Sequence, residues 1–259
     1  MSTDFKNYLE QLQLEQLLEK LAASNPKALA KTVQHFTRKE AEKRDAIVTN
    51  YFGECGIDQM VDAVTKLLFT KPPLPANAKV LDLGAGSGLF TVKVANKVHA
   101  KLPSASFFAV DLTPAMLLSL IKKKAGIIAF VGIAENIKGS IEQARVYFKI
   151  PQRFDAIFST LMLHHSTQPE KVFESIKTAV RTNGKAIVID LCEHGFEEFR
   201  TEMGDVHLSF KPEDICRMAR KYFSTVKVEK MSGICCKSSG RSAEIFIVTM
   251  RNPSQNSII

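Results

Sequence analysis

Runs of apolar and often β-branched residues alternate with amphipathic stretches along most of this chain. The apolar runs predict strands over residues 79–83, 106–110, 127–131, 154–158, 186–190, 226–230 and 244–250. Helical periodicity between most of them predicts helices over residues 89–98, 115–124, 168–180 and 212–222. Strand alternating with helix is typical of parallel strands joined by right-handed crossovers.

The last two predicted strands break this alternation. Only residues 232–242, rich in Gly, Cys and Ser, lie between them, and this leaves no room for a crossover helix. We therefore predict that they form an antiparallel hairpin. The expected fold class is α/β, with a seven-stranded, mostly parallel sheet that ends in a C-terminal antiparallel hairpin.

The amino-terminal part predicts helices. Asp4 can cap a first helix, and Ser24-Asn25-Pro26 can start a second. A third helix is predicted over residues 57–68, and it ends before the proline-rich segment 71–75. The expected organisation is therefore an N-terminal helical cap or lid over residues 1–75, an α/β domain over 76–251 and a flexible tail over 252–259.

A glycine-rich loop follows the first predicted strand. Gly84, Gly86 and Gly88 stand between that strand and a helix, where they let a ligand approach the backbone and the free N–H groups of the helix. A dinucleotide-binding fingerprint needs its third glycine one position later, where Leu89 stands, which disfavours a dehydrogenase. Asp82, just before the loop, would repel a pyrophosphate but can pair with an ammonium group.

Asp111 stands at the end of the second predicted strand. A carboxylate at this position can accept hydrogen bonds from both hydroxyls of a ribose. Alternatively, Asp111 caps the helix that begins near Pro114, a role that Thr113 can fill equally well. The order of strand, glycine loop, helix, strand and acid favours ligand binding.

This pattern resembles a known family. Residues 80–88 resemble the first motif of class I S-adenosylmethionine-dependent methyltransferases, and Asp111 matches the ribose-binding acid of that family. The similarity continues through residues 132–135 and 154–159 and covers residues 79–250, with Ile133 standing where many relatives carry an acid. The nearest subgroup resembles the small-molecule ubiquinone/menaquinone methyltransferases.

The resemblance implies a Rossmann-like fold for residues 76–251 and S-adenosylmethionine as the cofactor, with S-adenosylhomocysteine as the product. It also implies a set of cofactor-binding residues, namely Asp82, Gly84, Ala85, Gly86, Gly88, Asp111, Leu112, Ala134, Glu135 and Ser159.

Methyl transfer from a sulfonium is an in-line displacement, and its groups should follow strands four and five, where open α/β sheets bind ligands. The catalytic candidates there are His194, His165 and Glu193; the alternative is that they pack structurally or cap a helix. Candidates for substrate or lid contacts are Phe36, Tyr51, His164 and His207, and simple core packing is again the alternative. The spacing of the histidines fits no local metal motif, so we expect no metal.

The formal net charge of +8 permits an RNA or protein acceptor. Residues 1–70 hold nine Lys/Arg against ten Asp/Glu, so the excess lies in the remainder, but no dense basic block occurs. We therefore favour a small-molecule acceptor. RNA or protein methylation and cofactor binding without catalysis remain alternatives.

No apolar run is long enough to span a bilayer, and the first residues do not form a secretory signal. Together with an odd count of five cysteines, this predicts reduced thiols and a cytoplasmic protein, either a monomer or a homodimer.

Overall fold

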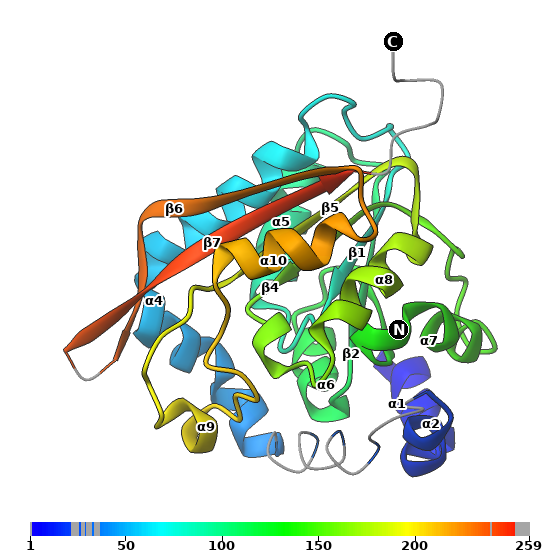
Figure 1. Ribbon diagram of the computed structural model, residues 1–259. Coiled ribbons are helices and arrows are strands. Elements are labelled where there is room, and N and C mark those ends of the chain that lie inside the picture. The colour runs from blue at the N-terminus through cyan, green and yellow to red at the C-terminus, as the bar shows by residue number, and fades with distance from the viewer. Residues whose placement is uncertain are drawn as a thin grey trace.

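The computed structural model describes residues 2–21, 26, 29, 33, 37–238 and 240–251, with side chains from Phe5 onward. A seven-stranded sheet crosses the molecule and has helices on both faces (Figure 1). The strand order is β3-β2-β1-β4-β5-β7-β6. The strands are β1 (Lys79–Leu83), β2 (Ser106–Asp111), β3 (Ile128–Val131), β4 (Phe154–Thr160), β5 (Val180–Leu191), β6 (Thr225–Ser238) and β7 (Arg241–Arg251).

The pairing of the strands confirms the predicted fold class. β1 lies parallel to β2 and β4, and the parallel pairing continues from β2 to β3 and from β4 to β5. β7 runs antiparallel to both β5 and β6. The carboxyl ends of β1, β2, β3, β4 and β5 therefore meet at one edge, where ligands bind in open α/β sheets.

Local sequence signals explain where many of the helices begin. Proline stands in the first turn of α6 (Pro114–Lys122), α8 (Pro169–Ala179) and α10 (Pro212–Arg220), where its missing N–H costs no helical hydrogen bond. The other helices with described bounds are α1 (Ser2–Gln11), α2 (Leu14–Leu21), α4 (Arg38–Leu68), α5 (Leu89–His99), α7 (Ile137–Ala144) and α9 (Phe199–Glu202), with the 3₁₀ turns η1 (Ala134–Asn136) and η2 (Leu163–His165).

The helix predicted over residues 57–68 is only the second half of α4. α4 begins at Arg38, after Thr37 accepts a hydrogen bond from the Glu40 N–H, and it bends at Gly53, whose φ is 68°. Its first half is rich in charged residues and has few apolar ones, so the hydrophobic periodicity is weak there. The amino-terminal half of α4 is therefore stabilised by tertiary contacts, which the sequence pattern does not reveal.

Other predicted boundaries also differ from the structure. The first helix begins at Ser2, ahead of the predicted cap Asp4, and it breaks between α1 and α2. Cys235 and Cys236 lie within β6 and not in a connection, because β6 continues past a register shift to Ser238. Phe36, the predicted tail over residues 252–259 and most of the predicted second helix lie outside the described residues.

One apolar cluster joins the amino-terminal helices to the sheet. Phe5, Leu17 and Met60 share it with Val80 and Phe107 of the sheet, and all five are buried. The Val131 N–H at the end of β3 also donates to the Tyr8 hydroxyl at 3.1 Å. Helices α1, α2 and α4 therefore pack on the sheet as part of its core, while the role of residues 1–75 as a lid stays a prediction. Among the described residues, no helix is long and apolar enough to cross a membrane.

Lys185 ties β5 to the end of α4. Its side chain is buried, and its Nζ donates to the carbonyl oxygens of Leu67, Leu68 and Thr70 at 3.1, 3.1 and 2.8 Å. The last carbonyls of a helix have no partner within the helix, so a buried ammonium at this place satisfies them and suits the helix dipole.

We expect Lys185→Met to lower the free energy of unfolding by about 1–3 kcal/mol, because the Leu68 and Thr70 carbonyls lose this donor. Urea unfolding followed by circular dichroism measures the change. Lys66→Met, at an exposed position of the same helix, is the control and should stay within about 0.5 kcal/mol of wild type. Equal stability of the two variants would contradict the proposed capping role.

Candidate functional site

A pocket opens at the carboxyl ends of the parallel strands, and the glycine loop forms its floor. The N–H groups of Gly84 and Ala85 both donate to the Val110 carbonyl of β2, at 2.9 and 3.1 Å. Gly84, Ala85 and Gly86 all line the pocket. A Cβ on Gly86 would meet no atom within 4 Å, so the backbone at this position faces open space.

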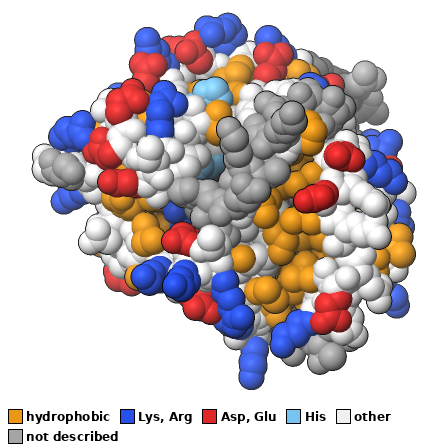
Figure 2. Space-filling model, turned by 90° about the horizontal axis from the view of Figure 1, so that it is seen from below, with side chains coloured by type: hydrophobic (Ala, Val, Ile, Leu, Met, Phe, Trp, Pro, Cys, Tyr) orange, Lys and Arg blue, Asp and Glu red, His pale blue; other side chains and the backbone are white. Residues whose placement is uncertain are grey.

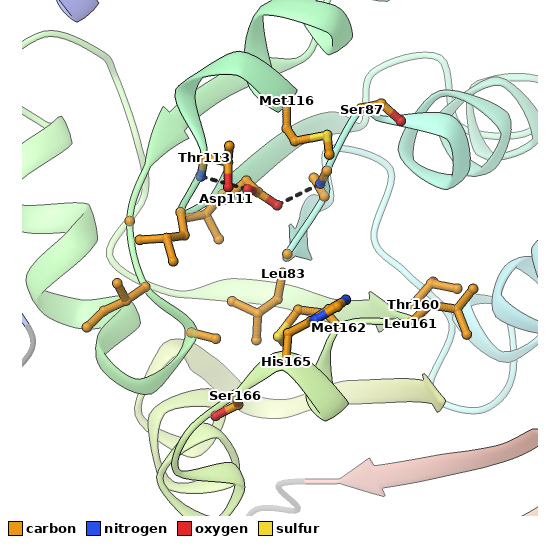
Figure 3. Close-up of a pocket in the computed structure, with 18 of the residues that line it drawn as sticks. Leu83, Ser87, Asp111, Thr113, Met116, Thr160, Leu161, Met162, His165 and Ser166 are labelled. Atoms are coloured by element: carbon orange, nitrogen blue, oxygen red, sulfur yellow. Dashed lines mark hydrogen bonds between the residues drawn. The ribbon is translucent and has the colours of Figure 1, made fainter. Parts of the chain in front are cut away.

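Asp111 holds the loop in place. One oxygen of its carboxylate accepts the Gly86 N–H and the other accepts the Thr113 N–H, both at 2.8 Å (Figure 3). Burial raises the pKa of Asp111, and these two backbone donors oppose that shift. The carboxylate lines the pocket and keeps lone pairs for further donors.

The turn after β3 forms a second wall. Gly132, Ile133, Ala134 and Glu135 line the pocket, and the Ser166 hydroxyl donates to Glu135 at 2.5 Å. Ile133 is buried and offers this wall an apolar side chain in place of an acid. The pocket therefore has one face of backbone and carboxylate groups and another that is largely apolar.

Helix α4 supplies a third wall and its positive charge. Arg44 lines the pocket, and attraction to Asp205 and Asp111 opposes the lowering of its pKa by burial. The neighbouring Asp45 accepts the Ser87 hydroxyl at 2.5 Å and pairs with Lys123 at 2.6 Å. These contacts hold the part of α4 that carries Arg44 against the glycine loop and α6.

Histidines gather at the opposite end of the pocket from Asp111. His165 lines the pocket beside Met162, across from Asp111 and Thr113 (Figure 3). His164 is buried behind it, and the two rings are 4.2 Å apart.

The chain also matches a known protein family. Residues 74–244 match the family described as a methyltransferase domain, which is more than half of the chain. The chain belongs to this methyltransferase family. The family resemblance inferred from the glycine loop is thereby confirmed.

One curated relative and two solved structures illustrate the similarity. The mitochondrial ubiquinone biosynthesis O-methyltransferase of Schizosaccharomyces pombe is 31% identical over 111 residues, which are 42% of this chain and 36% of that protein. The chain thus matches only about a third of that relative's length.

Among solved structures, phosphoethanolamine N-methyltransferase 2 of Haemonchus contortus, in complex with S-adenosyl-L-methionine, has a TM-score of 0.62 at 18% identity. The alignment covers 85% of this chain and 58% of that one. The YcgJ protein of Bacillus subtilis has a TM-score of 0.52 at 14% identity, covering 73% of this chain and 98% of that one. At these identities the structures show that the methyltransferase shares their fold.

Most of the predicted cofactor-binding residues line the pocket of this methyltransferase: Gly84, Ala85, Gly86, Asp111, Leu112, Ala134 and Glu135. Asp82, Gly88 and Ser159 lie behind that lining. Asp82 accepts the Thr91 hydroxyl at 2.6 Å, and burial raises its pKa to about 7. Ser159 donates to the Leu83 carbonyl at 2.7 Å, and Gly88 packs against Leu120. These three support the loop from below and do not line the pocket.

Of the three catalytic candidates, the structure brings only His165 to the pocket lining. Glu193 is exposed and lies 3.6 Å from Lys211. His194 packs on the Phe196 and Phe199 rings, and burial lowers its pKa. The backbone explains this placement, because the Glu193 and His194 N–H groups pair with the carbonyls of residues 210 and 208.

The predicted substrate and lid contacts lie outside the described lining. Tyr51 packs edge-on against Phe199, with ring centroids 5.2 Å apart. His207 stacks near Phe210, and His164 is buried beneath His165. Arg44 was not among the residues predicted from the sequence, because it lies in the half of α4 that has no clear helical periodicity.

The glycines of the loop should respond differently to a methyl group. On Gly84, φ is 72° and a Cβ would stand 2.1 Å from Met162, so we expect Gly84→Ala to lower the melting temperature markedly. A methyl group on Gly86 would meet open space in the pocket. We therefore expect Gly86→Ala to lower the free energy of unfolding by only about 1–2 kcal/mol, the cost of a positive φ at a residue with a side chain. Thermal unfolding measures both, and a Gly84→Ala variant as stable as Gly86→Ala would contradict this packing.

Proposed function

We propose that this chain is an S-adenosylmethionine-dependent methyltransferase that acts on a small-molecule acceptor. The observation that carries the proposal is the partly buried Asp111 carboxylate, held by the Gly86 and Thr113 N–H groups at the edge of an open pocket. The reaction is an in-line displacement: an acceptor atom bonds to the methyl carbon as the carbon–sulfur bond breaks. The bonding pair passes to sulfur, giving S-adenosylhomocysteine.

Each part of the cofactor can be assigned to residues of the pocket lining. Asp111 is placed to accept the ribose hydroxyls, and Gly84 to Gly86 allow close approach of the ligand. Leu112, Ile133 and Ala134 offer an apolar slot for the adenine. Arg44 supplies a cation for the carboxylate of the amino-acid portion, and we therefore add it to the proposed cofactor-binding residues.

His165 marks the acceptor end. It lies across the pocket from Asp111, so a methyl group on a cofactor whose ribose contacts Asp111 would point toward the histidine side (Figure 3). We retain His165 as the proposed residue at the acceptor. We drop His194 and Glu193, because their side chains face Phe196 and Lys211.

Charge pairing supports a small acceptor over RNA. Lysines of the basic part of the chain pair with acids of α4: Lys93 with Asp58, Lys97 with Asp62, Lys122 with Glu42 and Lys123 with Asp45. Acidic side chains are interspersed with Lys and Arg around the rim of the face seen in Figure 2. An RNA-binding surface would instead gather unbalanced positive charge. The relatives named above, an O-methyltransferase of ubiquinone biosynthesis and a phosphoethanolamine N-methyltransferase, also support a small molecule. A cytoplasmic location and a monomeric or dimeric state stay predictions.

Calorimetric titration of S-adenosylhomocysteine tests the cofactor site. We expect micromolar binding by wild type and about 10- to 100-fold weaker binding by Asp111→Asn, because the amide cannot accept both ribose hydroxyls while holding the loop. Asp62→Asn, at an exposed carboxylate of α4, is the control and should bind as wild type does. A folded wild-type protein that binds neither S-adenosylmethionine nor S-adenosylhomocysteine would refute the proposal.

The role of Arg44 can be separated by the choice of ligand. Arg44→Gln should weaken S-adenosylhomocysteine by about 10-fold or more, since it loses a charge-assisted bond to a carboxylate. The same variant should bind 5′-methylthioadenosine as wild type does, because that ligand has no amino-acid portion. Competition titration measures both affinities. An equal loss for the two ligands would instead assign Arg44 to holding the pocket in shape.

A further inference from the structure

A buried carboxylate orients His164. Asp190 at the end of β5 is fully buried, and its Oδ1 lies 2.5 Å from the His164 Nδ1. The His164 backbone N–H donates to the other Asp190 oxygen at 3.2 Å. This pairing favours the proton on Nδ1, so that the lone pair of His164 is on Nε2. Metal-binding histidines are held in the same way, with a carboxylate behind the ring.

A second carboxylate lies on the other side of the ring without a hydrogen-bond donor. Asp205 is 5% exposed, and neither of its carboxylate oxygens has a hydrogen-bond partner. Its Oδ1 lies 3.6 Å from the His164 Nε2 and 3.9 Å from the His165 Nδ1. These separations are too long for hydrogen bonds. A buried carboxylate in this state calls for a positive partner, either a bound cation or a protonated histidine.

The distances from Asp205 Oδ1 to the two histidine nitrogens are close to those between ligands that share one metal ion. Zinc lies about 2.0–2.2 Å from nitrogen and oxygen ligands, which places tetrahedral neighbours about 3.4 Å apart. One ligand atom from each of His164, His165 and Asp205 lies within 4.8 Å of the others. No metal was expected from the sequence, because the spacing of the histidines fits no local metal motif. The fold brings the loop that carries Asp205 against η2.

We propose that His164, His165 and Asp205 bind one divalent transition-metal ion, with Asp190 fixing the orientation of His164. Two imidazoles and one carboxylate suit zinc, cobalt or manganese better than magnesium, which prefers oxygen ligands. At His165, ligation through Nδ1 replaces the contact of that nitrogen with the Gly204 carbonyl, at 3.2 Å.

A metal at this position would lie at the acceptor end of the cofactor pocket. Three protein ligands leave a coordination position, and His165 itself lines the pocket. An acceptor hydroxyl bound there would have its pKa lowered and would release its proton to water. Its oxygen would then bond to the methyl carbon as the carbon–sulfur bond breaks and the bonding pair passes to sulfur. This role rests on the proposed function, whereas metal binding itself does not.

A proton on His164 competes with a metal ion for this site. Burial lowers the pKa of His164, but the Asp190 and Asp205 carboxylates outweigh this and raise it overall. An imidazolium at His164 would neutralise one of the two negative charges that flank it. The experiment must therefore detect the metal itself.

The test uses the full chain after dialysis against EDTA, titrated with cobalt(II) by visible absorption and with zinc(II) by calorimetry. We expect one metal ion per chain and cobalt d–d bands without the thiolate charge-transfer band that binding to cysteine would produce. Asp205→Asn should weaken zinc binding by more than about 100-fold, and Asp190→Asn by about 10- to 100-fold. Magnesium should bind weakly or not at all.

Asp214→Asn, on the exposed face of α10, is the matched control and should bind zinc as wild type does. S-adenosylhomocysteine titration of every variant verifies that each is folded. Wild type that binds this ligand but takes up no metal would overturn the metal site, as would an Asp205→Asn variant with unchanged zinc affinity or a thiolate band. Metal uptake without any cofactor binding would overturn the proposed function and leave the metal site intact.

Discussion

The carboxylate of Asp111 is the group on which the site depends. It joins the loop after β1 to the turn after β2 through the Gly86 and Thr113 N–H groups. Burying a carboxylate is unfavourable unless donors surround it, so the loop and the turn must keep these positions for the acid to remain ionised. The same acid that shapes the loop also faces the pocket. Loop geometry and the proposed ligand recognition therefore depend on the same group.

Helix α4 completes the pocket from outside the family match, which begins at residue 74. Its first half binds the glycine loop through Asp45 and Ser87 and places Arg44 in the lining. Its far end is anchored to β5 by Lys185. Between them, Gly53 bends the helix by adopting a positive φ, so that one continuous element reaches both the pocket and the opposite end of the sheet. The amino-terminal segment is thus part of the site's framework.

The sheet could be predicted because strands that are buried on both faces appear in the sequence as short apolar runs. β1, β2 and β4 are mostly buried on both faces of the sheet. The glycine loop directly follows β1, and closely spaced glycines at such a position indicate a tight turn or the close approach of a ligand. The same pattern does not give side-chain direction at the strand ends. Asp82 and Ser159 stand close to the loop in sequence, yet both point beneath it, toward Thr91 and the Leu83 carbonyl. Proximity to the motif was predictable, and membership of the lining was not.

The acceptor end depends on pairings that no local pattern encodes. Asp205 and His165 are forty positions apart, and they meet because the chain after β5 returns along its own path: Cys192 bridges Phe210, and the His207 N–H donates to the His164 carbonyl. That return turns His194 and Glu193 away from the pocket while it buries Asp205 beside the histidines of η2. Most of the proposed cofactor contacts therefore follow sequence motifs at the ends of β1, β2 and β3, whereas the proposed acceptor end depends on how one long connection folds back. This difference is why the sequence identifies the reaction class more readily than the acceptor.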